Sequence, residues 1–277
     1  MFNILIIGFG KTGSHLYYAL KASRLKLNIK VHKNSRLKLN IKNVSEADVI
    51  FICTQDDKIP AAVKLISDTR LDLKGKIITH TSGVHSSGEL KLLKKFKADT
   101  ASFHPVQTFE NKAAGRSNRF KNIYVAIEGT GKSEKVLSKL AKAVNAYPFT
   151  IDKKFKTLHH ICCVISSNFL VTNLSHIERI YRRKNGFKKH NFFNIYMPLI
   201  FQTLSNISHK GTVNSLTGPI ARNDVNTVRK HIKELEKIKD KQIIDYYKLI
   251  SNLTINIASR TRVVSKKQFK QLTKTKN

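Results

Sequence analysis

The sequence predicts an α/β fold, a doubly wound parallel sheet, followed by an all-α C-terminal domain. Three observations predict it. β-favouring segments alternate with helical ones through the first half, a glycine-rich turn ends the first of them, and only helical periodicity follows residue 152. We therefore expect two domains, 1–152 and 153–277, each long enough to bury a core of its own.

The first domain is expected to hold seven strands separated by helical segments. The segment 47–54 is nearly all apolar, as expected of a strand covered on both faces. Apolar residues at Leu16, Ala19 and Leu20 have helical spacing, and Pro60 suits the first turn of a helix. The expected strands are 2–8, 27–33, 47–54, 75–83, 98–105, 122–129 and 146–151, and the expected helices are 11–23, 59–67, 86–96 and 133–144.

The second half has helical periodicity from residue 153 onward, interrupted by one turn-rich stretch at 214–224. Further helical segments are expected at 192–208, 224–238 and 241–261. The basic C-terminal stretch 265–277 is expected to be a frayed tail.

Composition restricts the function classes. The chain has 51 basic and 18 acidic residues, a net charge of +33, which fits either a polyanion-binding surface or compositional drift toward lysine. We expect no specific nucleic-acid partner, because no basic block is interleaved with aromatic residues. Three cysteines give neither a disulfide framework nor a metal-ligand spacing, so no metal is expected. Without a membrane-length apolar run or a signal peptide, a cytoplasmic protein is expected.

The turn "IIGFGKTG" predicts a dinucleotide site. Gly8 would permit a tight turn, Gly10 would let a pyrophosphate approach the backbone, and Gly13 would let the helix pack closely on the sheet. A purely structural turn is the alternative. The similar stretch "EGTGKSEK" is rejected as an ATP site, because position 126 is alanine rather than glycine.

The second strand indicates which dinucleotide would bind. An acidic residue that binds the ribose hydroxyl is typical of NAD sites, whereas "HKNSR" supplies basic and hydroxyl groups. NADP is therefore favoured over NAD. The candidate cofactor-binding residues are Gly8, Phe9, Gly10, Lys11, Thr12, Gly13, Lys33, Ser35, Arg36, Thr54, Gln55 and Thr81.

Candidate catalytic groups follow the expected strands, because ligands of open α/β sheets lie at the carboxyl ends of the strands. Ser82 and His104 lie at the carboxyl ends of two of them, and the alternative for each is a structural residue of a loop. In the helical half, Ser167 lies almost above His160 at helical spacing, with Asn168 about 80° around the axis. The candidate catalytic residues are His160, Asn168, Ser82 and His104, and the candidate substrate-binding residues are Gln107, Ser167, Thr217 and Arg222.

The segments "IIGFGKTGSHL", "THTSG", "SFHPVQTF", "HHICCVISSNFLV" and "SLTGPIARND" resemble, in this order, the Rossmann-like proteins with a C-terminal DUF2520 domain. The layout is more distantly similar to ketopantoate reductase, pyrroline-5-carboxylate reductase and the β-hydroxyacid dehydrogenases. The resemblance implies a Rossmann-type domain, a helical domain like the C-terminal domain of 6-phosphogluconate dehydrogenase, and a homodimer formed through the helical domain. The catalytic lysine of the hydroxyacid dehydrogenases has no clear counterpart in the sequence.

Together these features predict an NADP-dependent oxidoreductase that transfers a hydride between nicotinamide and a small carbonyl, imine or hydroxy compound. We expect its substrate to be anionic. His160 is the expected general acid or base, Asn168 and Ser82 would position the substrate oxygen, and His104 is a second candidate acid. A non-catalytic NADP-binding or sensor protein of the same fold is the alternative, and a basic nucleic-acid-binding protein is a third.

Overall fold

The computed structural model describes residues 2–33, 38–113, 118–183, 191–261 and 264–273. The chain divides into two compact units, Met1–Phe169 and Leu170–Asn277. The division lies within helix α7 (Asn168–Arg183), beyond the change of sequence pattern at residue 152, so helix α6 (Lys156–Ser166) is part of the first unit.

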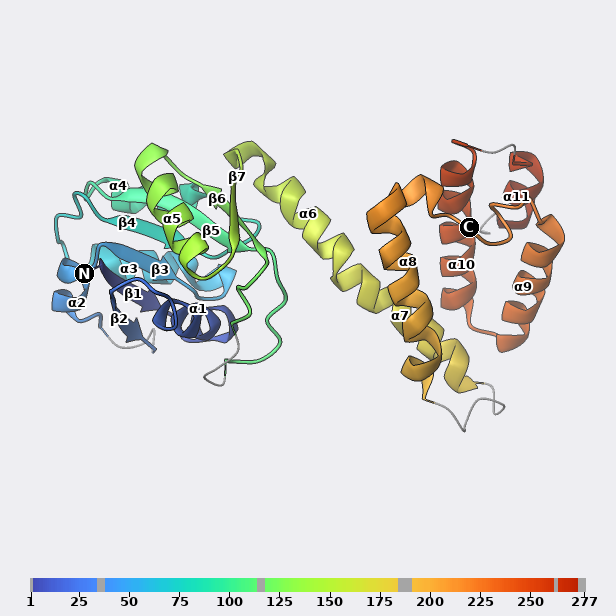
Figure 1. Cartoon of the computed structure of the whole chain (residues 1–277), viewed down its shortest axis with the longest axis horizontal. Coiled ribbons are helices and arrows are strands. Elements are labelled where there is room, and N and C mark those ends of the chain that lie inside the picture. The colour runs from blue at the N-terminus through green and yellow to red at the C-terminus, as the bar shows by residue number, and fades with distance from the viewer. Residues whose placement is uncertain (1, 34–37, 114–117, 184–190, 262–263, 274–277) are drawn as a thin grey trace. The chain divides into compact units, whose positions relative to one another are not determined.

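The first unit is built on a seven-stranded sheet with the order β2-β1-β3-β4-β5-β6-β7 (Figure 1). The strands are β1 (Phe2–Ile7), β2 (Leu27–His32), β3 (Val49–Ile52), β4 (Ile77–His80), β5 (Asp99–Pro105), β6 (Tyr124–Glu128) and β7 (Tyr147–Thr150). Each lies within a segment predicted to be a strand. The first five run parallel to one another, as expected.

The prediction of a parallel sheet is wrong at one pair, because β6 runs antiparallel to β5 while β7 runs parallel to β6. A parallel pair needs a crossover connection, usually a helix. The described residues between these strands, 106–113 and 118–123, form turns and irregular chain instead. The chain therefore returns directly along β5.

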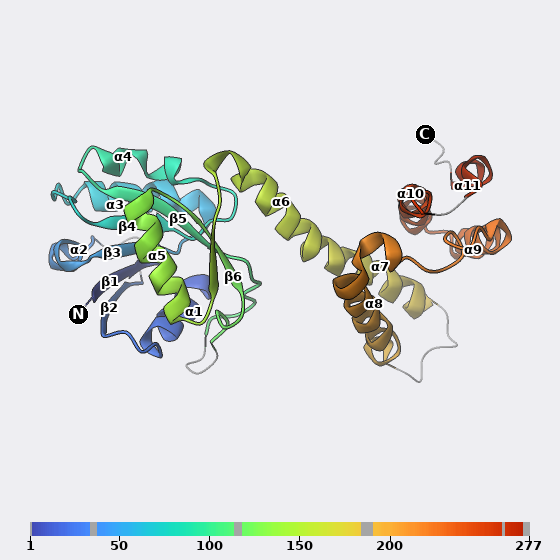
Figure 2. The same cartoon turned by 45° about the horizontal axis from the view of Figure 1, so that its top comes forward.

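Helices cover both faces of this sheet, as Figures 1 and 2 show. Alternate residues of β1 point to opposite faces: Ile4 and Ile6 pack with α1 (Lys11–Lys21) and α5 (Gly131–Ala143). Leu5 and Ile7 pack on the other face with α2 (Ile41–Glu46), α3 (Ile59–Ser67) and α4 (Lys91–Lys94). This alternation and the double covering are those of a doubly wound fold.

Short elements complete the first unit. Helix α2 is absent from the sequence prediction, and its N-cap is Asn40, whose side chain accepts hydrogen bonds from the backbone N–H groups of Lys42 and Asn43. The first unit also contains the short 3₁₀ helices η1 (Asp56–Lys58), η2 (Ser87–Leu90) and η3 (Lys153–Phe155).

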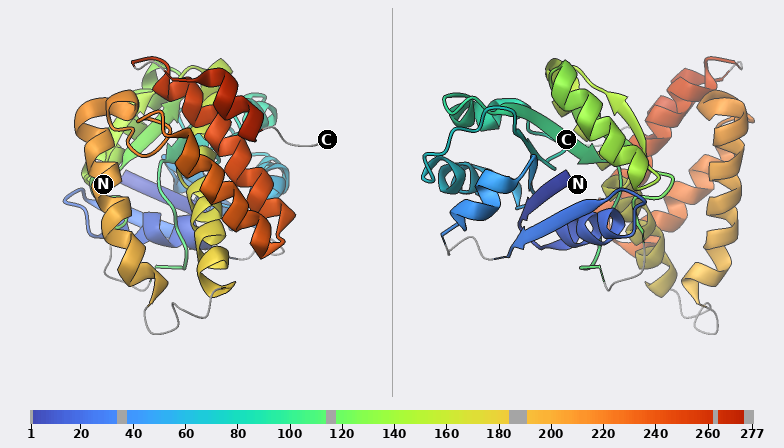
Figure 3. Two further views of the ribbon diagram at one scale, coloured as in Figure 1. Left: turned by 90° about the vertical axis from the view of Figure 1, so that its right-hand side faces the viewer. Right: turned by 60° about the vertical axis from the view of Figure 1, so that its left-hand side comes forward.

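The described part of the second unit is helical, in agreement with the sequence. Besides most of α7 it contains α8 (Phe192–Asn214), α9 (Val225–Ile238), α10 (Lys241–Ala258) and α11 (Lys266–Thr273). Figure 3 shows the last three side by side. Within the described residues, no helix is long and apolar enough to span a bilayer.

The expectation of a frayed C-terminal tail is wrong for residues 266–273, which form α11. Phe269 is completely buried with Val228, Ile232 and Ile255 of the neighbouring helices. Burial of one aromatic side chain is worth roughly 1.5–3 kcal/mol, enough to hold a short helix whose other residues are mostly basic.

Candidate active site

The carboxyl ends of four strands meet along one edge of the sheet. Strand pairing aligns Ile7 of β1 with Ile52 of β3, Ile52 with His80 of β4, and His80 with Ser102 of β5. The residues that follow these positions therefore lie at the same edge. The structure thus brings the glycine turn, Thr54, Thr81 and His104 to one edge.

The three glycines of the turn have different surroundings. Gly8 has φ +97°, and a Cβ there would lie 2.8 Å from the carbonyl oxygen of Cys53. A Cβ on Gly13 would lie 2.1 Å from the carbonyl oxygen of Gly8. A Cβ on Gly10 would meet no described heavy atom within 4 Å. Gly8 and Gly13 are therefore required by packing, whereas Gly10 leaves open space beside the backbone.

Helix α1 begins at this open space. Gly10 is its N-cap and provides no side-chain hydrogen bond to the first turn, in which Lys11 is exposed and Thr12 half-buried. The first N–H groups of a helix lack intrahelical partners and carry partial positive charge. Nearby, Thr54 Oγ1 is buried and has no hydrogen-bond partner among the described residues. The turn therefore fits a phosphate-bearing ligand.

Aromatic and basic side chains flank the turn. The ring of Phe9 packs edge-on against Tyr17, with centroids 5.5 Å apart, and Lys33 Nζ lies 5.4 Å from the Phe9 centroid. Gln55 is exposed and precedes η1. Ser35 and Arg36 lie outside the described residues. Lys33 is thus the one predicted 2′-phosphate ligand that the structure describes.

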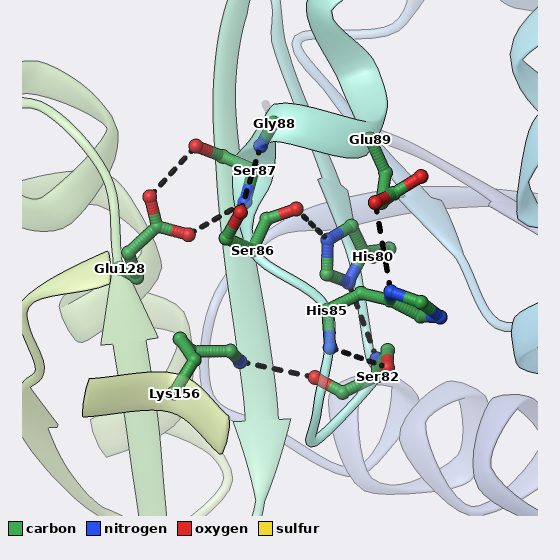
Figure 4. Close-up of polar contacts among 9 residues, drawn as sticks. All are labelled: His80, Ser82, His85, Ser86, Ser87, Gly88, Glu89, Glu128 and Lys156. Atoms are coloured by element: carbon green, nitrogen blue, oxygen red, sulfur yellow. Dashed lines mark hydrogen bonds and ion pairs between the residues drawn. The ribbon is translucent and has the colours of Figure 1, made fainter. Parts of the chain in front are cut away.

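Ser82 lies in a loop held by hydrogen bonds (Figure 4). Its N–H donates to His80 Nδ1 at 3.3 Å, and its Oγ accepts from the N–H of His85 at 3.2 Å. Nε2 of His80 is 2.9 Å from the carbonyl oxygen of Ser86, so His80 is bonded at both ring nitrogens. Burial lowers the pKa of His80, which favours the neutral ring. Ser82 keeps its hydroxyl proton available to donate.

Lys156, the first residue of α6, is the functional candidate that sequence reasoning missed. Its side chain is buried, and Nζ donates to the carbonyl oxygen of Ser82 at 3.0 Å and to Ser102 Oγ at 2.8 Å. Burial lowers its pKa to about 8, partly opposed by the negative charge of Glu128. Perturbed lysines of this kind are frequent in active sites. A signal did exist: Lys156 and His160 are four residues apart, hence on one helix face.

Glu128 at the end of β6 is buried beside this lysine, as Figure 4 shows. Its carboxylate accepts from the N–H of Ser87 at 2.6 Å and from Ser87 Oγ at 2.7 Å. A buried carboxylate needs such donors to offset its desolvation. Glu128 therefore anchors η2 and supplies a negative charge to the surroundings of Lys156.

His104 and His160 lie against Gly83. A Cβ on Gly83 would be 2.5 Å from His160 Nδ1 and 2.8 Å from His104 Nε2. His160 Nδ1 is buried without a hydrogen-bond partner among the described residues. Burial and the charge of Lys156 lower the pKa of His104 to about 3, so its ring is neutral at pH 7. The structure thus gathers three of the four predicted catalytic residues.

A pocket of about 520 Å³ lies beside Lys156. The loop at 84–86 and the start of α6 form its walls, and His85, Lys153 and Lys154 line it together with Lys156. Glu89 and Asp152 also line the pocket, within ion-pair distance of His85 and Lys154, so Lys153 and Lys156 supply the positive charge that fits an anionic small molecule.

The other predicted site residues lie elsewhere. Ser167 ends α6 and Asn168 begins α7, so the helical spacing assumed from His160 to Asn168 is interrupted, and Asn168 is exposed. Gln107 is exposed, and its Oε1 accepts from the N–H of Thr108. Thr217 and Arg222 belong to the second unit, and their roles stay predictions.

Comparisons with known proteins agree with this architecture. Residues 123–254 match the family described as domain of unknown function DUF2520. No curated protein sequence matches the chain.

Three solved structures show the same fold. Protein TM1727 from Thermotoga maritima is 24% identical, with 94% of this chain and 100% of that chain covered and a TM-score of 0.70. Protein BF3122 from Bacteroides fragilis is 18% identical, with 92% of this chain and 98% of that chain covered and a TM-score of 0.69. An imine reductase from Myxococcus stipitatus, in complex with NADP⁺, is 10% identical over 93% of each chain, with a TM-score of 0.64.

Proposed function

From the match of residues 123–254 to DUF2520 and the fold shared with the solved structures above, we propose that this chain is an NADP-dependent oxidoreductase of the Rossmann-like proteins with a DUF2520 domain. Its substrate would be a small anionic carbonyl, imine or hydroxy compound. The observation that carries the proposal is the open space beside Gly10 at the start of α1, where a side chain would intrude on a bound phosphate.

The dinucleotide would be held by the residues around this turn. Backbone N–H groups of Lys11 and Thr12 would bind the diphosphate, and Thr54 would offer its unpartnered hydroxyl. Lys33, which is exposed beside Phe9, would bind the 2′-phosphate and so favour NADP over NAD. The bound nicotinamide would supply or accept the hydride.

The chain's own residues would bind the substrate and move the proton. The lysines of the 520 Å³ pocket would hold the anionic group of the substrate. Lys156 would stabilise developing negative charge on the substrate oxygen or nitrogen, and the Ser82 hydroxyl would donate to the same atom. His160 would give or take the proton at that atom. Lys156 would thus take the catalytic position for which the sequence offered no clear lysine.

Coenzyme binding tests the proposal through thermal unfolding with NADPH and with NADH. NADPH at a hundred times its dissociation constant should stabilise the protein by about 2.7 kcal/mol, and NADH at the same concentration by less. Gly10→Ala should unfold like the wild type without coenzyme, because its Cβ enters open space, but should lose most of the stabilisation. Gly131→Ala is the matched control, since it also adds a Cβ in open space at a helix start.

Two outcomes would contradict the proposal: no stabilisation of the wild type by either coenzyme, or full stabilisation of Gly10→Ala. A third result discriminates the alternative function. If NADPH binds and yet is not oxidised with any member of a panel of carbonyl and imine compounds, the chain is a non-catalytic NADP-binding protein.

A further inference from the structure

Three metal-binding side chains gather beside the candidate active site. His104 comes from the end of β5, and His159 and Cys163 come from α6. One donor atom of each lies within 4.8 Å of the other two. All three side chains are half-buried, so a small ion from solvent would reach them.

The fold holds these groups in place. His159 and Cys163 are four residues apart and therefore share a helix face. The ring of Phe149 packs edge-on against His159, with centroids 5.7 Å apart. His104 directs Nε2 toward Gly83, which leaves Nδ1 for the cluster. The donors are thus fixed by a strand, a helix and a packed ring.

The donor spacing fits tetrahedral coordination. His104 Nδ1 and His159 Nε2 are 3.3 Å apart, and His159 Nε2 and Cys163 Sγ are 3.8 Å apart. Zinc bonds of about 2.05 Å to nitrogen and 2.3 Å to sulfur, at tetrahedral angles, place two nitrogens about 3.3 Å apart and a nitrogen and a sulfur about 3.6 Å apart. The donor atoms of the remaining pair, His104 and Cys163, lie within 4.8 Å of each other, so closing the triangle requires side-chain rotation and no change of the backbone elements.

We propose that His104, His159 and Cys163 form a binding site for a zinc ion. Two imidazoles and a thiolate suit zinc, whereas magnesium and calcium prefer oxygen ligands. Binding forms three metal–ligand bonds, and the Cys163 thiol releases its proton to solvent. A zinc ion with three protein ligands keeps a fourth position for water or for an oxygen of a bound molecule. The site is independent of the nicotinamide coenzyme, so either proposal can fail alone.

The test is a cobalt(II) and zinc titration of the full chain, stripped of metal by a chelator and kept reduced. Cobalt(II) should bind with one equivalent and give the intense visible bands of a tetrahedral ion, with a thiolate-to-cobalt absorption in the near ultraviolet. Zinc should displace it. Cys163→Ser should abolish the thiolate absorption, and His159→Gln should weaken zinc binding by at least about 100-fold, because even outer-shell changes cost about 10–100-fold.

Cys162→Ser is the matched control. Cys162 is the adjacent residue on α6, is exposed, and is not one of the three clustered donors. This variant should bind cobalt and zinc like the wild type. The proposal is overturned if the wild type shows no thiolate absorption, if Cys163→Ser retains it, or if zinc binds equally to wild type, Cys163→Ser and His159→Gln. The last result would indicate adventitious binding by surface histidines.

Discussion

Lys156 combines a positive charge with an almost fully buried side chain, 1% exposed. Burying a charged group costs free energy unless hydrogen bonds or an opposite charge compensate for the lost hydration. The carbonyl oxygen of Ser82 and the hydroxyl of Ser102 accept hydrogen bonds from two of its three N–H groups, and Glu128 provides negative charge nearby. Among the described residues no acceptor is seen for the third N–H, and Lys156 lines the adjoining pocket, where a substrate would accept from it.

We predict that Lys156→Met lowers turnover by about 100-fold or more, the scale of losing one positioned proton donor or electrostatic group. Stabilisation by NADPH should stay near that of the wild type, because Lys156 lies outside the glycine turn. Steady-state kinetics and thermal shifts measure the two effects. Lys142→Met in the last turn of α5 is the control, since Lys142 is exposed. Equal turnover in both variants would remove Lys156 from the mechanism.

The lowered pKa of Lys156 also predicts a pH dependence of stability. Between pH about 8 and 10.5 the unfolded chain holds this proton and the folded chain does not. The free energy of unfolding of the wild type, measured relative to Lys156→Met, should therefore rise with pH across that interval and stay level below it. Urea unfolding at a series of pH values measures the difference. A flat difference would show that the folded-state pKa is not lowered.

Sequence reasoning proposed Ser82, His104 and His160, which the structure brings close together, because polar residues at strand ends and on an amphipathic helix are conspicuous. It missed Lys156 because the chain has 51 basic residues, and nothing local distinguishes a buried lysine from an exposed one. Among the lysines that the structure describes, Lys156 is the buried one. Its burial depends on Ser82 and Ser102, 74 and 54 residues away.

The glycine turn illustrates what is predictable for an element. The spacing of Gly8, Gly10 and Gly13 is local, and so are the strand and helix on either side. The antiparallel return of β6 and the helix α11 were not predictable in this way. The first depends on an irregular connection and the second on tertiary burial of Phe269. Local sequence patterns therefore predict the position and type of most elements. The direction of β6 and the helix α11 depend on contacts between residues far apart in the sequence.

We predict that Gly13→Ala destabilises the protein by roughly 1–3 kcal/mol or more, the usual cost of overpacking. Its Cβ would lie 2.1 Å from the Gly8 carbonyl oxygen, so α1 must move away from β1. Gly10→Ala adds the same atom three residues earlier without a contact within 4 Å and should leave the unfolding midpoint unchanged. Urea unfolding without coenzyme compares the two variants. Similar midpoints for both would contradict the packing role of Gly13.

The second unit exposes many large apolar side chains. Leu199 and Phe201 on α8 are 65% and 63% exposed, and Leu249 and Leu253 on α10 are 54% and 51% exposed. Such concentrations are unusual on the surface of a monomer. We propose that the helical domain forms a homodimer through these helices. The exposed apolar residues are the observation that supports it.

Sedimentation velocity should accordingly give a mass twice that of the 31.5 kDa chain. The double variant Leu249→Glu and Leu253→Glu, which charges one face of α10, should sediment as a folded monomer. Lys266→Glu with Lys270→Glu makes a comparable change on exposed positions of α11 and should stay dimeric. A monomeric wild type at micromolar concentration would refute the dimer.

Burial of a single lysine amine has a practical consequence for chemical modification. Reductive methylation converts solvent-accessible amines to dimethylamines, which keep their positive charge, and it is slow at an amine that is reached only through a pocket. Treatment of the intact protein should therefore modify Lys156 last among the lysines that the structure describes. Peptide mass spectrometry would then identify Lys156 by its unmodified mass, and its labelling only after unfolding would report how tightly the native fold encloses it.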